Sequence, residues 1–226
     1  MLYIVATPIG NLEDITLRAL RILREVDLIA CEDTRRTKIL VDHYKIEKPL
    51  ISFHQHSKLQ KIDLLIEKLK SGQNIALVTD AGTPGIADPG GVLIDRALKN
   101  KINVDAIPGP DAATLLLSLS GIPVERYLFL GFLPKKKGRQ TTLKLMASLE
   151  VPTVIFESPH RIKKTLADIL EFIGDREVIV GRELTKKFQE VKRGKISEVL
   201  PTLRAQGEFV IIVYESTKKD IKIQKI

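Results

Sequence analysis

Short apolar segments alternate with amphipathic helical segments over residues 1–115, and this alternation limits the folds that the chain can adopt. The segments LYIVA, DLIAC, LISF, IALVT and INVDAI each have the length of one β-strand. After LISF, Leu59, Ile62, Leu65 and Leu69 recur at helical spacing. Strands separated by amphipathic helices are typical of a mostly parallel sheet with both faces covered. We therefore expect an α/β domain here.

The pattern changes in the second half of the chain. YLFLGFLP, TVIFE, EVIVGREL, KFQEVKRG and EFVIIVYES are expected strands, and GRQTTLKLMASL, SPHRIKKTLADILEFIG and ISEVLPTLRAQ are expected helices. The last three strands have only one helix among them, which indicates some antiparallel pairing. The sequence therefore predicts two α/β domains, at 1–117 and 118–226, with a mostly parallel sheet in the first and a mixed sheet in the second.

Composition excludes several classes of protein. A chain of 226 residues with 44% hydrophobic content can bury a large core. It has no apolar stretch long enough to cross a bilayer, and MLYIVATPIG lacks the features of a signal peptide, so we expect a cytoplasmic protein with no membrane partner. The single Cys31 excludes an internal disulfide and a cysteine zinc cluster. Only HQH at 54–56 places histidines close together, and we expect no metal.

Positive charge is concentrated in two segments. Lys and Arg outnumber Asp and Glu by 36 to 28, a formal net charge of +8 that attracts polyanions. TRRTK (34–38) and PKKKGR (134–139) hold much of it in short runs. Such runs are as often solvated faces as phosphate-binding sites, and both interpretations stay open. The candidate phosphate contacts are Arg35, Arg36, Lys135, Lys136, Lys137 and Arg139.

Three loops rich in glycine and proline follow strands of the first domain. They are TPIGN (7–11), DAGTPGIADPG (80–90) and PGP (108–110). In a parallel sheet they gather at the carboxyl edge, where open α/β sheets bind ligands. Glycine allows close backbone approach and proline stiffens the chain. Neither G-x-G-x-x-G nor G-x-x-x-x-G-K-[ST] occurs, so the loops predict a cradle for a small flat ligand of another kind.

These loops belong to a longer series of motifs. ATPIGNLEDIT, EDTRRT, TDAGTPGIADPG, PGPDAA, GFLP, FESPHR and RELTKK occur in order over residues 1 to about 216. As a set they resemble the ribosomal RNA small subunit methyltransferase I family, within the tetrapyrrole methylase superfamily. The resemblance implies a homodimer of two α/β domains with S-adenosylmethionine in the cleft between them. It also implies methyl transfer to the ribose 2′-hydroxyl of a cytidine in the decoding region of 16S ribosomal RNA, as free RNA or as an assembled 30S subunit.

The resemblance also implies the cofactor contacts, and the chemistry of methyl transfer to RNA suggests further site residues. Glu157 is a candidate base or an acceptor for the cofactor's amino group, and Lys186 is a candidate catalytic cation. His160 and Arg161 are candidate RNA contacts. Gln189 departs from the family, whose members often carry an acid there, and the chain ends soon after YES. The implied cofactor contacts are Pro8, Gly82, Thr83, Pro84, Ile86, Gly109, Pro110, Ala112, Phe156, Glu157, Leu184 and Thr185.

Two alternatives remain at the level of sequence. A precorrin-type tetrapyrrole C-methyltransferase would share the cofactor and the cleft, although the two basic runs fit extended phosphate contacts better than a compact polycarboxylate. A non-catalytic RNA-binding module would have no use for the three loops. It would also be expected to carry aromatic residues on a binding strand, and aromatic residues make up only 5% of the chain.

Overall fold

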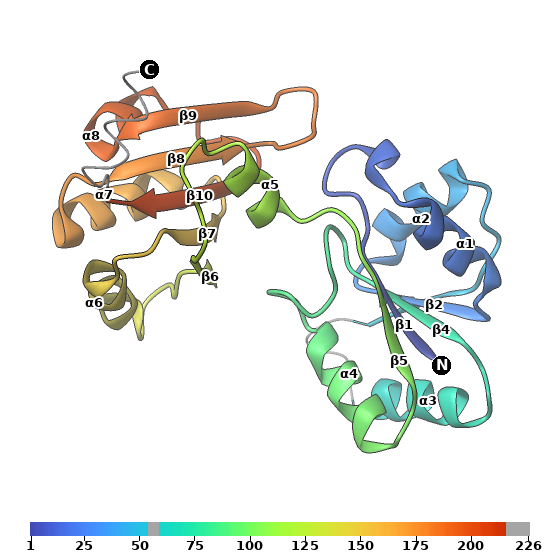
Figure 1. Ribbon diagram of the computed structural model, residues 1–226. Helices are drawn as coiled ribbons and strands as arrows, with labels where there is room; N and C mark the ends of the chain where they lie inside the picture. Colours follow the sequence, from blue (N-terminus) through green and yellow to red (C-terminus); the bar gives the residue numbers. More distant parts are fainter. Residues whose placement is uncertain (54–58, 216–226) are drawn as a thin grey trace. The chain divides into compact units, whose positions relative to one another are not determined.

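The computed structural model describes residues 1–53 and 59–215, and these divide into two compact units (Figure 1). The first unit is Met1–Asp111, and the second begins at Ala112. The HQH segment at 54–56 lies outside the described residues. Helix α5 (Ala112–Ser118) was expected in the first domain, but it packs against a strand of the second sheet and is counted with the second unit.

The first unit is built on a parallel sheet of five strands, as predicted. The sheet order is β3-β2-β4-β1-β5, and every pair is parallel. The chain runs from β1 outward to β3 and then returns through β4 to β5. The central pair β1 and β4 therefore forms the point at which the winding reverses. The strands are β1 (Leu2–Val5), β2 (Leu28–Cys31), β3 (Leu50–Ser52), β4 (Ile75–Val78) and β5 (Val104–Ile107).

Helices cover both faces of this sheet. Successive strand residues point to opposite sides, so each strand contributes apolar side chains to both helix layers. Ile29 and Cys31 pack with the cluster of α1 and α2, whereas Leu28 and Ala30 pack with that of α3 and α4 (Figure 1). Thr16 begins α1 by accepting a hydrogen bond from the Ala19 amide at 3.1 Å. The helices are α1 (Leu17–Glu25), α2 (Thr34–His43), α3 (Leu59–Lys70) and α4 (Gly90–Lys99), with a 3₁₀ turn at Leu12–Asp14.

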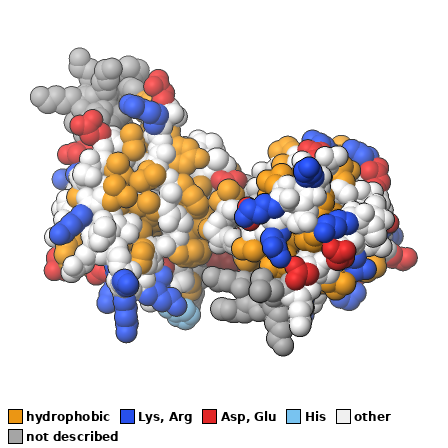
Figure 2. Space-filling view, turned by 90° about the horizontal axis from the view of Figure 1, so that it is seen from below, with side chains coloured by type: hydrophobic (Ala, Val, Ile, Leu, Met, Phe, Trp, Pro, Cys, Tyr) orange, Lys and Arg blue, Asp and Glu red, His pale blue; other side chains and the backbone are white. Residues whose placement is uncertain are grey.

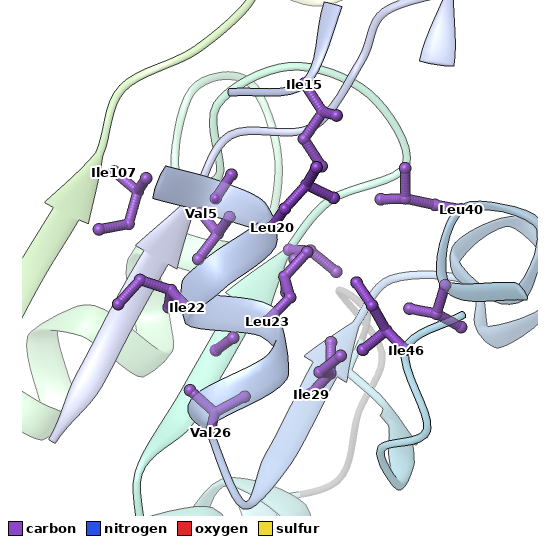
Figure 3. Packing of buried hydrophobic residues seen from close by; sticks show 14 of the residues in the cluster. Val5, Ile15, Leu20, Ile22, Leu23, Val26, Ile29, Leu40, Ile46 and Ile107 are labelled. Atoms are coloured by element: carbon purple, nitrogen blue, oxygen red, sulfur yellow. The ribbon is translucent and has the colours of Figure 1, made fainter. Parts of the chain in front are cut away.

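The cluster under α1 holds the end of the central strand in place. Figure 3 shows Leu20 and Leu23 of α1, and Val26 directly after the helix, pointing into a cluster that Val5 and Ile29 line from the sheet. Val5, Leu23 and Ile29 have no exposed surface. The backbone that leaves β1 therefore starts from a rigid base, which fixes the position of the loop that follows.

The second unit contains the mixed sheet that the sequence predicted. Its order is β6-β7-β10-β8-β9, in which only β6 and β7 are parallel. One face packs against α6, α7 and α8, and α5 lies on β10. A Cβ at Gly181 would lie 2.8 Å from Leu116 of α5, so this glycine allows α5 to approach. The elements are β6 (Leu128–Phe132), α6 (Arg139–Ser148), β7 (Thr153–Glu157), α7 (Ile162–Ile173), β8 (Glu177–Arg182), β9 (Glu190–Lys195), α8 (Ile196–Val199) and β10 (Phe209–Tyr214).

Two expected helices differ in their bounds. Helix α7 begins at Ile162, because residues 159–161 form a turn instead of helix. The Ser158 carbonyl accepts hydrogen bonds from the amides of Arg161 and Ile162 in this turn. The helix expected over 196–206 ends at Val199 and continues as a 3₁₀ turn, Leu200–Thr202, which contains Pro201 and its missing N–H. Across residues 1–53 and 59–215, no helix has the length and apolar character needed to cross a membrane.

Candidate functional site

The three loops of the first unit meet at the end of β1, as the sequence predicted. Thr7 and Gly82 form an antiparallel bridge, with N···O distances of 2.9 and 3.0 Å in the two directions. Gly82 has φ +82°, a conformation that favours glycine. The third loop lies against the same strand end, since a Cβ at Gly109 would lie 2.8 Å from the Cβ of Ala6. The cradle therefore requires glycine at both positions.

A chain of polar contacts ties three strand ends together at this edge. The Thr7 hydroxyl donates to the Thr79 carbonyl at 3.1 Å, and the Thr79 hydroxyl donates to Glu32 at 2.8 Å. The Asp33 amide donates to Asp80 at 3.0 Å. Burial, together with the charge of Glu32, raises the pKa of Asp80. The carboxyl edge of the sheet is thus rigid and carries several carboxylates.

Asp88 holds the second loop in its conformation, a role that sequence reasoning missed. Both of its oxygens accept from the Gly85 amide, at 2.8 and 2.9 Å, and one also accepts from the Gly90 amide at 2.7 Å. Gly85 has φ +88° and Ala87 has φ +61°, so the turn is sharply bent. The available signal was an aspartate directly before Pro–Gly at a helix start, a position where its side chain bonds nearby amides.

The candidate cofactor residues fall into two groups. The first group lies at one edge of the first sheet, where the structure brings together Pro8, the 80–90 loop and the 108–110 loop. Ile86 is half exposed at 50%, whereas Pro84 is buried. The second group lies in the second unit, and its shared role with the first stays a prediction. That second group is Ala112, Phe156, Glu157, Leu184 and Thr185.

Glu157 is buried, and its hydrogen bonds stay within its own unit. Only 1% of the residue is exposed. Its oxygens accept from the Ser158 amide at 2.8 Å and from the Thr165 hydroxyl at 2.7 Å, and Arg161 lies 3.5 Å away. This geometry indicates a carboxylate that fixes the turn between β7 and α7, rather than a base facing an acceptor.

Lys186 is held as a cation. Its ammonium group contacts Glu183 and Glu208, each at 2.9 Å. Burial would lower the pKa of Lys186, but the hydrogen bonds to Glu183 and Glu208 outweigh it, and the pKa is raised. Lys186 therefore keeps its proton and is unsuited to act as a general base. Gln189, the departure from the family pattern, accepts from the Thr185 amide at 2.6 Å.

Leu184 and Thr185 lie in the sharp turn that follows β8. Leu184 is buried, with 5% of its surface exposed. Thr185 has φ +67°, which is unusual for a β-branched residue. Its hydroxyl is buried and has no hydrogen-bond partner within residues 1–53 and 59–215. A strained turn with an unpaired buried hydroxyl is common at ligand sites, and it supports the candidate role of Thr185.

The basic loop between β6 and α6 contains two different kinds of side chain. Lys135, Lys136 and Lys137 are exposed. By contrast, the Arg139 side chain is only 11% exposed, and it donates to Asp168 at 2.7 Å and to the Pro134 carbonyl at 3.2 Å.

The expected phosphate contacts of Arg139 and Arg161 do not match this geometry. Arg161 donates to the Leu133 carbonyl at 2.6 Å, so the two arginines hold successive carbonyls at the start of the basic loop. Their guanidinium groups face their own unit, because long-range partners occupy them. We therefore assign Arg139 and Arg161 to anchoring the loop, and the three lysines remain as its candidate phosphate contacts.

The other candidate RNA contacts lie on the surface. The Arg35 side chain is 90% exposed and pairs with Asp33 at 2.7 Å, and its hydrogen bond lowers the pKa of Asp33 to about 2. Arg36 is 59% exposed and lies 3.5 Å from Asp80. His160 is exposed in the turn before α7. Within the described residues no group of three or more His, Cys, Asp or Glu could hold a metal ion.

Comparison with known proteins identifies the family. The model of the tetrapyrrole (corrin/porphyrin) methylases matches residues 1–200. A ribosomal RNA small subunit methyltransferase I from Thermotoga maritima is 48% identical over 215 residues, covering 94% of this chain and 97% of the relative. The protein of the same name from Bacillus subtilis is 45% identical over 225 residues, covering 98% of this chain and 77% of the relative.

Solved structures show the same fold at low sequence identity. A diphthine synthase superposes with a TM-score of 0.76 at 14% identity, covering 99% of this chain and 94% of that chain. A cobalt precorrin-4 methyltransferase superposes with a TM-score of 0.71 at 15% identity, covering 94% of both chains. The protein therefore belongs to the tetrapyrrole methylase family and is an S-adenosylmethionine-dependent methyltransferase.

Proposed function

We propose that this enzyme methylates the ribose 2′-hydroxyl of a cytidine in the decoding region of small-subunit ribosomal RNA. The observation that carries the proposal is the 45 to 48% identity, over nearly the whole chain, to proteins named ribosomal RNA small subunit methyltransferase I. The exposed lysines of the β6–α6 loop support a polyanionic substrate. We further propose a cytoplasmic homodimer that acts on the RNA or on the assembled 30S subunit.

The first unit fits the cofactor through its backbone. The bridge at Thr7 fixes one end of the 80–90 loop and Asp88 fixes the other, leaving Thr83 to Ile86 as a pre-formed turn between them. A pre-formed loop binds its ligand without a large ordering cost. When bound, S-adenosylmethionine supplies a methyl group made electrophilic by a positively charged sulfur. The carboxylates of Glu32 and Asp80 at the same edge favour a positively charged ligand.

Orientation is the main contribution that these residues can make to the rate. A rigid loop that holds the methyl group in line with the acceptor oxygen supplies much of the rate enhancement of a transfer reaction. Lys186, which keeps its proton, suits the role of a cation beside the developing oxygen charge. Glu157 supports the β7–α7 turn, and we assign it no proton transfer.

The acceptor atom can be tested by alkaline hydrolysis. A 2′-O-methylated ribose cannot attack its own 3′ phosphate, so the purified enzyme should produce RNA whose alkaline ladder lacks one band, at a cytidine. Small-subunit RNA from cells without the protein serves as substrate and, untreated, as control. RNA that gains a methyl group but gives a complete ladder would exclude the ribose and point to a base. Transfer to a tetrapyrrole but not to RNA would favour the alternative activity.

A further inference from the structure

An exposed phenylalanine ends β6 beside the basic loop. Phe132 is 53% exposed, although Gly131 and Leu133 on either side of it are buried. Its ring is 5.8 Å from that of Phe156, which is itself 5.0 Å from that of Phe129, and both contacts are edge-to-face. The β6–β7 register places Phe132 opposite Phe156, on the face of the sheet away from Ile155 and from helices α6, α7 and α8. The aromatic cluster therefore fixes the ring while leaving much of it open to solvent.

Three exposed lysines follow this ring closely in the chain. Three extended residues span at most about 11 Å, so Lys135 lies near Phe132. In residues 1–53 and 59–215, Lys135, Lys136 and Lys137 have no ion pair with an acidic group. Arg139 and Arg161 fix the carbonyls at the start of the loop, as described above. Figure 2 shows hydrophobic side chains gathered on the second unit, at the left of the view, with Lys and Arg side chains around them.

We propose that Phe132 is a stacking platform for an unpaired base of the RNA substrate, and that Lys135 to Lys137 bind phosphates of the same strand. Aromatic rings stack on splayed bases whatever their identity, and neighbouring cations follow the backbone. A base within a helix is already stacked on both sides, so the platform selects an unpaired segment. This inference rests on the proposed RNA substrate and adds that the bound RNA segment is unpaired.

Charge favours RNA over a second copy of this chain as the occupant. In a two-fold interface centred on this surface, the lysines of both copies would approach one another, and like charges repel. An RNA strand instead supplies both an apolar base face and a negative backbone. One RNA strand can therefore bind both the exposed Phe132 ring and the three lysines.

The test compares matched phenylalanine variants of the full-length protein. Phe172→Ala is the control, because Phe172 is 48% exposed on α7 of the same unit and makes no ring contact with the aromatic cluster. The probes are a short single-stranded RNA that carries the decoding-region sequence and the same sequence in a duplex. We expect Phe132→Ala to weaken single-strand binding at least about fivefold and duplex binding little. Phe132→Trp keeps an aromatic ring and should bind the single-stranded RNA about as well as the wild type. The affinity for S-adenosylmethionine should be unchanged in all three variants.

Several outcomes would overturn the platform. Equal RNA affinity for Phe132→Ala and Phe172→Ala would exclude stacking at this ring. Lost cofactor binding would assign the ring to the cofactor, and an altered oligomeric state would assign it to self-association. Methyl transfer to RNA by the wild-type protein is measured in parallel. Transfer without any effect of Phe132→Ala would reject the platform alone, whereas absence of transfer to any RNA would reject the proposed function.

Discussion

At the scale of single residues, Asp88 is expected to serve the cofactor loop at some cost to the stability of the fold. Burial raises its pKa even though two amides donate to it, so folding disfavours the charged carboxylate relative to the unfolded chain. In the sense of linkage, a folded pKa above the unfolded value means that the ionised carboxylate costs free energy of folding at neutral pH. A buried carboxyl group with a raised pKa is typical of functional sites.

Replacing Asp88 with Asn should therefore weaken the cofactor site without unfolding the protein. Asparagine keeps one acceptor oxygen but loses the charge, so the bonds to Gly85 and Gly90 weaken and the loop loses its pre-formed turn. We expect S-adenosylmethionine affinity to fall about tenfold by calorimetry, with a melting temperature no lower than that of the wild type. Asp95→Asn is the control, since Asp95 is exposed on α4 and pairs with Lys99. A variant that melts early and binds normally would show that Asp88 serves only the fold.

At the scale of elements, sequence patterns predicted the features that are set by residues close together in the chain, namely the strands, the helices and the loops between them. The alternation of strands and helices predicted both sheets, and the strand-end loops predicted where they would meet. The patterns could not predict partners distant in the chain. Arg139 looks like part of a basic run, yet it pairs with Asp168, 29 residues away. The packing of α5 on β10 likewise depends on Gly181, which has no local signature for that contact.

The β6–α6 loop gives a prediction that separates lysine from arginine. A lysine that binds a phosphate releases a counterion, so removing one such lysine should lower the slope of log affinity against log salt by about 0.7 to 0.9. Changing Lys135, Lys136 and Lys137 to Ala should therefore weaken RNA binding and flatten its salt dependence, with little effect on melting, because the three side chains are exposed. Titrations with RNA at several salt concentrations measure the slope.

Arg139→Ala is the matched comparison in the same loop. It leaves Asp168 without its partner, so it should lower the free energy of unfolding by about 1.5 to 3 kcal/mol in urea titrations. Its salt slope should stay close to that of the wild type wherever the variant is folded. Parallel salt slopes for the triple lysine variant and the wild type would show that the loop does not hold RNA.

At the scale of the whole molecule, the chain has two separately packed units, and the residues implied in cofactor binding fall in both. One group lies in loops joined to β1, and the other lies at the ends of β7 and β8. The two groups differ in character. The loops of the first unit offer backbone and carboxylates, whereas the second unit offers the aromatic Phe156 and the unpaired hydroxyl of Thr185.

Hydrogen exchange with and without S-adenosylmethionine can test each group independently. We expect slower exchange at the amides of Thr83, Gly85 and Ile86, because ligand contact suppresses local opening of a partly exposed turn. If Thr185 contributes, its amide and that of Lys186 should also slow, although both already bond within the turn, to Gln189 and Glu183. Strands β4 and β8 serve as internal controls, since their ladder bonds are protected in both states. Protection confined to the first unit would remove Phe156, Leu184 and Thr185 from the site, while protection of neither loop would place the cofactor elsewhere.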